Sequence, residues 1–201
     1  MNFINKNENQ VEKQKSGTTD KSIISSETKP QFARIVDEDV IKSVEFSSLP
    51  MTLTQFESLP QAEMQSPYET AAMFIVALNH YIQNKVESIA MINFLKGPNQ
   101  LSPRELNLIK MQMTDYLARS YFNGATPQND YTPTQPHNVV ISDNKHSYNN
   151  HGSAKLFIHC GGADSPRPIE LRLAKDSRWY LTGFSSLLVG IRSTESTNPW
   201  V

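Results

Sequence analysis

The stretch that most clearly indicates the fold is AKLFIHCGGADSPRPIELRLA, residues 154–174. On both sides of its central GGADSPRP segment, every second side chain is apolar, which is the pattern of a strand with one buried face. These apolar positions are Leu156, Ile158, Cys160, Ile169, Leu171 and Leu173. The sequence therefore predicts two neighbouring strands joined by residues 161–168.

Further strands are predicted on either side of this pair. Downstream, KDSR at 175–178 is typical of a tight turn into a strand over 179–184. Upstream, NVVIS at 138–142 predicts another strand. Residues 184–192 fit either a strand or a short helix, and residues 34–46 would add a short strand or helix to the domain.

The clearest helix signal precedes the strands, in SPYETAAMFIVALNHYI at residues 66–82. Ser66 is expected to cap the helix, Pro67 to occupy its first position, and Glu69 to reach back to the cap. An apolar stripe at three- and four-residue spacing follows: Ala71, Phe74, Ile75, Leu78 and Ile82.

Three other segments also predict helices. Thr54 and Glu57 stand at capping-box spacing and predict a short helix over 52–59. Residues 86–98 predict a helix that ends at a Gly-Pro pair, and residues 102–120 begin with Ser, Pro and Glu in capping positions. The apolar stripe of this last helix is Leu106, Ile109, Met113 and Leu117.

Helices followed by a block of antiparallel strands predict an α+β fold, with the N-terminal helices packed on a curved antiparallel sheet of about four to five strands. This order of elements would fit a cone-like sheet resembling the nuclear-transport-factor-two superfold. Residues 34–201 are predicted to form a single domain. Residues 1–33 are rich in Asn, Lys, Gln, Ser, Thr and Glu and predict a disordered tail.

Composition argues against several classes of protein. The 201-residue chain has a net charge of −1, which gives no electrostatic reason to expect nucleic acid or an acidic membrane. Its single cysteine cannot form an internal disulfide. The first residues lack the apolar run of a signal peptide, and the longest apolar run, residues 71–78, is too short to span a bilayer. We expect a cytoplasmic protein.

Several unusual strings together resemble an uncharacterised bacterial domain family: SLPMTLTQFESLP, MINFLKGPNQLS, SYFNGATPQNDYTP, GGADSPRPIELR, WYL and NPW. The resemblance covers about residues 47–201 and implies a soluble bacterial protein with no known reaction, cofactor or catalytic residue. The chain departs from the family pattern in its long N-terminal tail and in Asn198, where an acidic residue is expected.

Two loops are candidates for a site, and the first is the ring-rich, proline-rich segment 120–137. Because connections of this length without secondary structure are usually functional or disordered, and because its rings gain by covering apolar surface, we expect an ordered loop. Such an ordered loop would be either a packed crossover between the helices and the sheet, which we favour, or part of a binding site. The candidate ligand-binding residues of this loop are Tyr121, Asn123, Asn129 and Tyr131.

The second candidate loop is GGADSPRP, residues 161–168. Gly161 and Gly162 permit another chain segment to approach closely, so we expect the first loop to lie against this one. Asp164 and Arg167 are candidate ligand-binding residues, with Arg167 and backbone N–H groups facing a phosphate or carboxylate. We favour a structural Asp164–Arg167 clasp over this anion site.

His159 and Cys160 invite comparison with a nucleophile–base pair. In a continuing strand they would point to opposite faces and could not bond to each other, so we expect Cys160 to be buried and inert. No metal site, cofactor or complete catalytic motif is predicted. The sequence therefore predicts a non-catalytic binding or protein-interaction module. The alternative is an enzyme or small-ligand protein that binds an anion between residues 120–131 and 161–167.

Overall fold

The structure of the chain is a computed structural model that describes residues 39–197. The predicted tail, residues 1–33, lies outside these described residues. Within residues 39–197, five strands form one antiparallel sheet in the order β1-β2-β3-β4-β5. They are β1 (Ile41–Phe46), β2 (His137–Ser142), β3 (Ser153–Ile158), β4 (Arg167–Leu173) and β5 (Trp179–Gly183).

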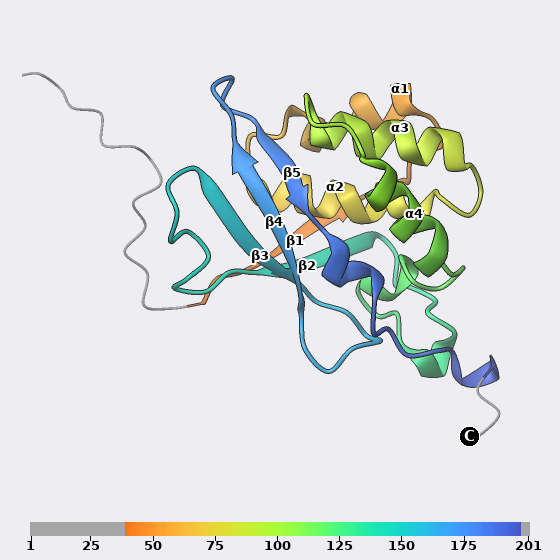
Figure 1. Ribbon diagram of the computed structural model, residues 1–201. Helices are drawn as coiled ribbons and strands as arrows, with labels where there is room; N and C mark the ends of the chain where they lie inside the picture. Colours follow the sequence, from red (N-terminus) through yellow and green to blue (C-terminus); the bar gives the residue numbers. More distant parts are fainter. Residues whose placement is uncertain (1–38, 198–201) are drawn as a thin grey trace, which may run out of the picture. The chain divides into compact units, whose positions relative to one another are not determined.

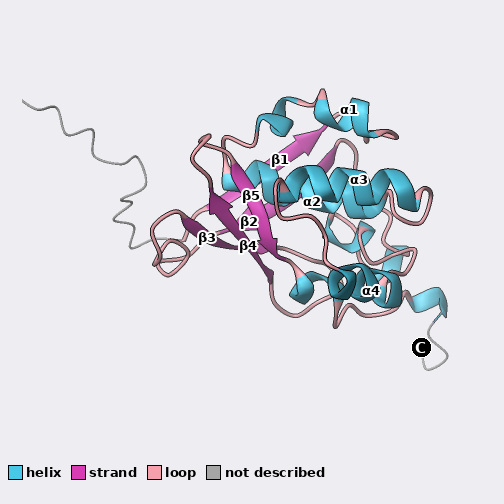
Figure 2. Ribbon diagram, turned by 45° about the horizontal axis from the view of Figure 1, so that its top comes forward, coloured by secondary structure: helices cyan, strands magenta, loops and turns pink. Residues whose placement is uncertain are grey.

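Four α-helices within the same range pack on one face of this sheet (Figures 1 and 2). They are α1 (Leu53–Glu57), α2 (Pro67–Asn79), α3 (Lys85–Lys96) and α4 (Pro103–Gln112). Helix α2 contacts all five strands, and α3 covers α2 on its other side. The predicted α+β class and the antiparallel sheet are confirmed.

The two faces of the sheet differ as the alternation predicts. On β3, Ala154, Leu156 and Ile158 are buried toward the helices, whereas Lys155 is exposed on the opposite face. Strands β4 and β5 show the same alternation of buried and more exposed side chains. The core therefore lies between this sheet and α2, and no helix of residues 39–197 covers the other face of the sheet.

Helix α2 is buried almost all round, because it lies between the sheet and α3. Pro67 occupies the first helical position as predicted, but the predicted side-chain cap is wrong: Ser66 accepts no hydrogen bond at its hydroxyl. The first turn is instead tied to the sheet. The Thr70 hydroxyl donates to the carbonyl of Trp179 at 3.0 Å.

Two other predicted helix boundaries need correction. The cap of α1 is Thr52, whose hydroxyl accepts from the Gln55 N–H, and not Thr54. Helix α4 ends at Gln112 rather than near residue 120, because Met113 takes an extended conformation and the chain turns. Packing of the following segment has here overridden the helical periodicity of the sequence.

The two segments of uncertain type are resolved. Residues 41–46 of the segment 34–46 form β1, which pairs with β2 at one edge of the sheet. Within 184–192, Ser185–Leu188 form a short 3-10 helix, η4, that buries two leucine side chains.

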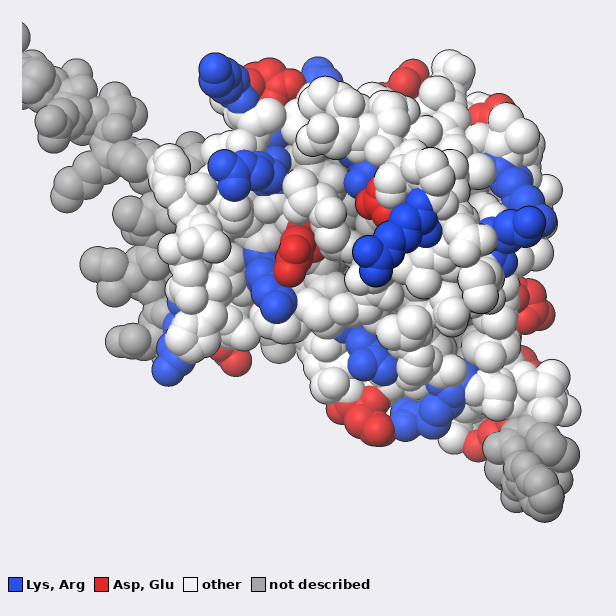
Figure 3. Space-filling view, viewed as in Figure 1, with Lys and Arg blue, Asp and Glu red and all other residues white. Residues whose placement is uncertain are grey.

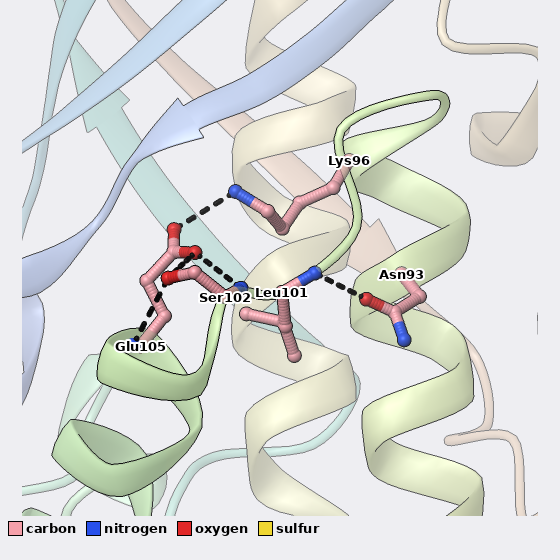
Figure 4. A network of polar contacts seen from close by, with 5 residues as sticks. All are labelled: Asn93, Lys96, Leu101, Ser102 and Glu105. Carbon is pink, nitrogen blue, oxygen red and sulfur yellow. Dashed lines mark hydrogen bonds and ion pairs between the residues drawn. The ribbon is translucent and has the colours of Figure 1, made fainter.

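The joint between α3 and α4 holds a partly buried ion pair (Figure 4). Lys96, whose side chain is 5% exposed, donates to Glu105 at 2.9 Å. The same carboxylate accepts from the backbone N–H and the hydroxyl of Ser102, which completes the predicted capping box of α4. Asn93 accepts from the Leu101 N–H at 2.8 Å, so side chains of both helices fix this joint.

Candidate functional site

Residues 120–136, which we call loop A, are ordered by hydrogen bonds within the loop. The Asn129 side chain accepts from the N–H groups of Thr126 and Thr132 and donates to the carbonyls of Gly124 and Thr132. The backbone N–H of Thr134 donates to the carbonyl of Asn123 at 3.0 Å. The loop is therefore the shaped segment that its rings and prolines predict, rather than a linker.

Part of loop A adopts a costly backbone conformation. Asp130 and Tyr131 have φ values of 52° and 54°, in the left-handed region that non-glycine residues rarely adopt. The Tyr131 ring is fully buried and stacks on Tyr116 with ring centroids 5.4 Å apart. Packing of this ring offsets the cost of the backbone conformation.

Residues 159–166, which we call loop B, lie directly against loop A. The Gly161 N–H donates to the carbonyl of Ser120 at 3.0 Å, and a Cβ at Gly161 would overlap the carbonyl oxygen of Ala125. A Cβ at Gly162 would overlap the Tyr131 hydroxyl. Both glycines thus permit the close approach of loop A, as expected from the sequence.

A third segment, residues 189–197, crosses both loops, and we call it the C-terminal strap. It bonds to loop A through the Tyr131 hydroxyl, which donates to the carbonyl of Arg192 at 2.7 Å, and to loop B through the Arg192 N–H, which donates to the carbonyl of Gly162 at 2.9 Å. Gln128 and Asp130 of loop A also bond to strap side chains. The strap was not predicted as part of the site.

Together, loops A and B enclose a cleft of about 310 Å³, the loop cleft. Its walls consist of backbone groups and mainly uncharged side chains, and Asp164 contributes a carboxylate. The residues that line it are Tyr121, Phe122, Asn123, Gly124, Ala125, Thr126, Val140, His159, Cys160, Gly161, Ala163, Asp164, Ser165 and Pro166.

The structure divides the six predicted ligand-binding residues into two groups. Tyr121, Asn123 and Asp164 line the loop cleft, whereas Asn129, Tyr131 and Arg167 do not. In the second group, the Asn129 amide and the Tyr131 hydroxyl bond within the loops and to the strap. The side-chain amide of Asn123 has no hydrogen-bond partner among the described residues.

Arg167 and Asp164 do not form the predicted clasp. The Arg167 Nη2 donates to the carbonyl of Gly190 in the strap at 2.8 Å, and Asp164 pairs with Arg192 at 2.5 Å. The strap competes for both side chains, and this could not be inferred from the spacing within GGADSPRP. Arg167 therefore holds the strap through this hydrogen bond and does not line the loop cleft.

His159 and Cys160 both contribute to the lining of the loop cleft. The pairing with β2 continues to His159, whose N–H donates to the Val140 carbonyl at 2.9 Å, and Cys160 packs against the core, as the strand alternation predicts. They do not bond to each other: the His159 Nε2 lies 3.2 Å from the Ser142 hydroxyl, and the Cys160 Sγ lies 3.2 Å from the Ser120 hydroxyl. Burial raises the pKa of the Cys160 thiol, although Ser120 and the Gly162 N–H favour the thiolate.

The family model described as a domain of unknown function, DUF6935, matches residues 48–195. The chain belongs to the DUF6935 family. The expected membership of an uncharacterised family is thereby confirmed. No curated protein and no solved structure matches the chain. The resemblance of this DUF6935 domain to a cone-like, nuclear-transport-factor-two sheet therefore stays a prediction.

The matched range contains both loops and all but the last two residues of the strap, so the loop cleft lies wholly within the DUF6935 domain. Among residues 39–197, no group of three His, Cys, Asp or Glu side chains is placed to hold a metal ion. No helix in the same described range is long and apolar enough to cross a membrane.

The raised pKa of Cys160 predicts slow reaction with thiol reagents. At pH 8 in the folded DUF6935 domain, we expect iodoacetamide to alkylate Cys160 more slowly than the same thiol in urea, because the thiolate is the reacting form. The ratio of the folded to the unfolded rate should rise as the pH approaches the folded pKa, while limited access to the buried thiol keeps it below one. Equal rates at pH 8 would contradict a buried thiol.

The contacts of the strap are expected to differ in their effect on stability. Tyr131→Phe removes a buried hydroxyl and leaves the Arg192 carbonyl without its donor, so we expect a loss of about 1 kcal/mol in the free energy of unfolding. Asp164→Ala breaks an exposed ion pair and should change stability less. Urea denaturation of both variants measures the difference, and the reverse order would contradict the role given to Tyr131.

Proposed function

We propose that this DUF6935 domain is a non-catalytic binding module that takes a small, uncharged polar molecule in the loop cleft. The observation that carries the proposal is the way the cleft is built. Two loops separated in sequence are brought together by paired glycines and crossed by the strap. Its volume, about 310 Å³, is at the lower end of the range of small-molecule sites.

The lining supports an uncharged ligand. No lysine or arginine of the described residues lines the loop cleft, and its carboxylate, Asp164, is paired with Arg192. The amide of Asn123 and the hydroxyl of Ser165 are polar groups that would face a ligand. An anion at this position has less support than the sequence suggested, because Arg167 bonds to the strap.

The chemistry of the cleft favours binding over catalysis. The two groups that most resemble a nucleophile and its base, Cys160 and His159, bond to different serines. A raised thiol pKa keeps Cys160 in its less nucleophilic form. These features support a recognition role for both side chains.

A cytoplasmic location is part of this proposal, since a buried thiol without a disulfide suits a reducing compartment. A protein partner has less support. The six large exposed apolar side chains of the described residues are spread along the sequence: Ile41, Met51, Ile82, Val86, Met111 and Val189.

The experiment is a nuclear magnetic resonance titration of the whole chain with a panel of uncharged polar molecules: sugars, nucleosides, and small amides. We expect at least one class to shift amide signals from both loops, with Asn123 and Ser165 among them. A panel that leaves both loops unchanged would contradict the proposal.

Two matched variants test whether such a shift comes from the loop cleft. Ser165→Trp places a large ring at the cleft lining and should abolish the shift, whereas Ser48→Trp adds the same ring at an exposed position outside the lining and should not. A response that survives Ser165→Trp would show that the ligand binds elsewhere.

A further inference from the structure

A second cleft lies away from loops A and B, where the strands β3, β4 and β5 meet the segment 146–150. Its volume is about 600 Å³, and none of its lining residues lines the loop cleft. We call it the sheet cleft. It is lined by His146, Ser147, Asn149, Asn150, Ser153, Ala154, Lys155, Glu170, Leu171, Arg172 and Thr182.

Two cations stand in the sheet cleft without an acidic partner. Lys155 on β3 and Arg172 on β4 are both exposed on the face that the helices do not cover. Among the described residues, neither side chain has a carboxylate oxygen within 4.0 Å. The guanidinium of Arg172 is nevertheless held in place, since its Nη1 donates to the Ser153 hydroxyl at 3.2 Å.

Glu170 is the acidic residue of this cleft, and its position explains why the cations are unpaired. It lies directly across from Lys155 in the register of β3 and β4. Its carboxylate, however, lies over the neighbouring strand, where Oε2 would be 2.9 Å from a Cβ at Gly183. The absence of a side chain at Gly183 gives the carboxylate this space. The lining holds two cations, Lys155 and Arg172, and one carboxylate, Glu170, so its net charge is positive.

The rest of the cleft wall offers neutral hydrogen-bonding groups. The Asn150 amide and the Thr182 hydroxyl have no hydrogen-bond partner among the described residues, and the Asn149 amide contacts only the His146 ring. Over the strands labelled β3, β4 and β5 in Figure 1, basic and acidic side chains lie close together on the surface (Figure 3).

We propose that the sheet cleft binds the phosphate group of a small organic phosphate. Arg172 presents a forked donor that suits phosphate oxygens, and Lys155 adds a second positive charge on the adjacent strand. The amide and hydroxyl groups of the wall would meet the hydroxyls of the organic part. Since both cations are exposed, added salt should weaken the binding.

The test is calorimetric titration of the whole chain at low salt with inorganic phosphate, glucose 6-phosphate and glucose. We expect glucose 6-phosphate to bind more tightly than inorganic phosphate, and any heat from glucose to be the same in Arg172→Gln as in the unaltered chain. Equal affinity for the two phosphates would contradict the part assigned to the organic group. The absence of binding by either phosphate would overturn the site.

Three variants separate a specific site from a general effect of charge. Lys155→Met and Arg172→Gln should each weaken the binding of glucose 6-phosphate by about tenfold, the effect of one lost charge-assisted hydrogen bond. Glu170→Gln should tighten it by roughly two- to threefold, since a nearby negative charge is removed. All three positions are exposed, so the variants should fold normally.

Lys110→Met is the matched control, because it removes one positive charge from the exposed face of α4, outside the sheet cleft. This variant should bind glucose 6-phosphate as the unaltered chain does. An equal loss in Lys110→Met and Lys155→Met would show that net charge, and not the sheet cleft, attracts the anion.

Discussion

Gly161→Ala is expected to lower the free energy of unfolding by about 3 kcal/mol or more. The added methyl group would overlap the backbone carbonyl oxygen of Ala125, and backbone cannot move aside as a flexible side chain can. Relief requires loop A to move away from loop B, which would weaken the Gly161–Ser120 hydrogen bond as well. Urea denaturation measures the loss in stability.

Hydrogen exchange locates the effect of this substitution. In Gly161→Ala, amides of residues 121–133 should exchange faster than in the unaltered chain. The amides of α2 should keep the same ranking of exchange rates among themselves in both proteins. Gly183→Ala is the matched control: neither glycine has a positive φ, but every contact at Gly183 is with the Glu170 side chain, and the nearest is its flexible carboxylate end. If both variants lose the same stability, close approach of the loops is not what Gly161 provides.

Local signals in the sequence were sufficient for much of the fold. The alternation in residues 154–174 correctly predicts β3 and β4, since each buried position has an apolar side chain. The Ser102–Glu105 spacing correctly predicts the capping box of α4. Both inferences rest on contacts within one strand or one turn, which the order of residues largely determines.

The position of loop A against loop B could also be predicted from the sequence, because two adjacent glycines at a strand end indicate that another chain segment approaches closely. The partners of Asp164 and Arg167 could not be predicted. Both side chains bond to residues of the strap, more than 20 positions away in the sequence. Such pairings depend on where the chain returns after β5, and no local pattern encodes that path.

Cys160 combines a predictable and an unpredictable feature. Its place in an alternating run predicts a side chain buried with Leu156, and Cys160 does pack, partly buried, against the core that contains Leu156. The alternation could not predict the contact of the Cys160 Sγ with the Ser120 hydroxyl, because that contact depends on a segment 40 residues away in the sequence.

Glu105→Gln is expected to lower the free energy of unfolding by about 2–3 kcal/mol. A glutamine can keep the bond to the Ser102 N–H only by turning its NH₂ group toward the Lys96 ammonium. The Lys96 side chain is 5% exposed, and its ammonium would lose its counter-charge. Ser102→Ala, which removes the hydroxyl cap and keeps the ion pair, should cost only about 1 kcal/mol.

The double variant Lys96→Met/Glu105→Gln decides whether the uncompensated charge is the cause. Methionine fills a similar volume without a charge, so the double variant should be more stable than Glu105→Gln alone. Thermal or urea unfolding of the four proteins gives the coupling energy directly. Simple addition of the two single losses would show that packing at the joint, and not the ion pair, sets the stability.

The pH dependence of the same variants provides an independent check. Burial raises the pKa of the Glu105 carboxyl, but the bonds from Lys96 and Ser102 outweigh burial and hold the pKa below its usual range. A carboxyl with a lowered folded pKa stabilises the protein above its unfolded pKa, and this contribution is lost as the pH falls through the folded pKa. The stability gap between the unaltered chain and Glu105→Gln should therefore be constant near neutral pH and narrow below about pH 4.3, the usual glutamate pKa. A gap that stays constant in acid would mean that the Glu105 carboxylate does not interact with Lys96 in solution.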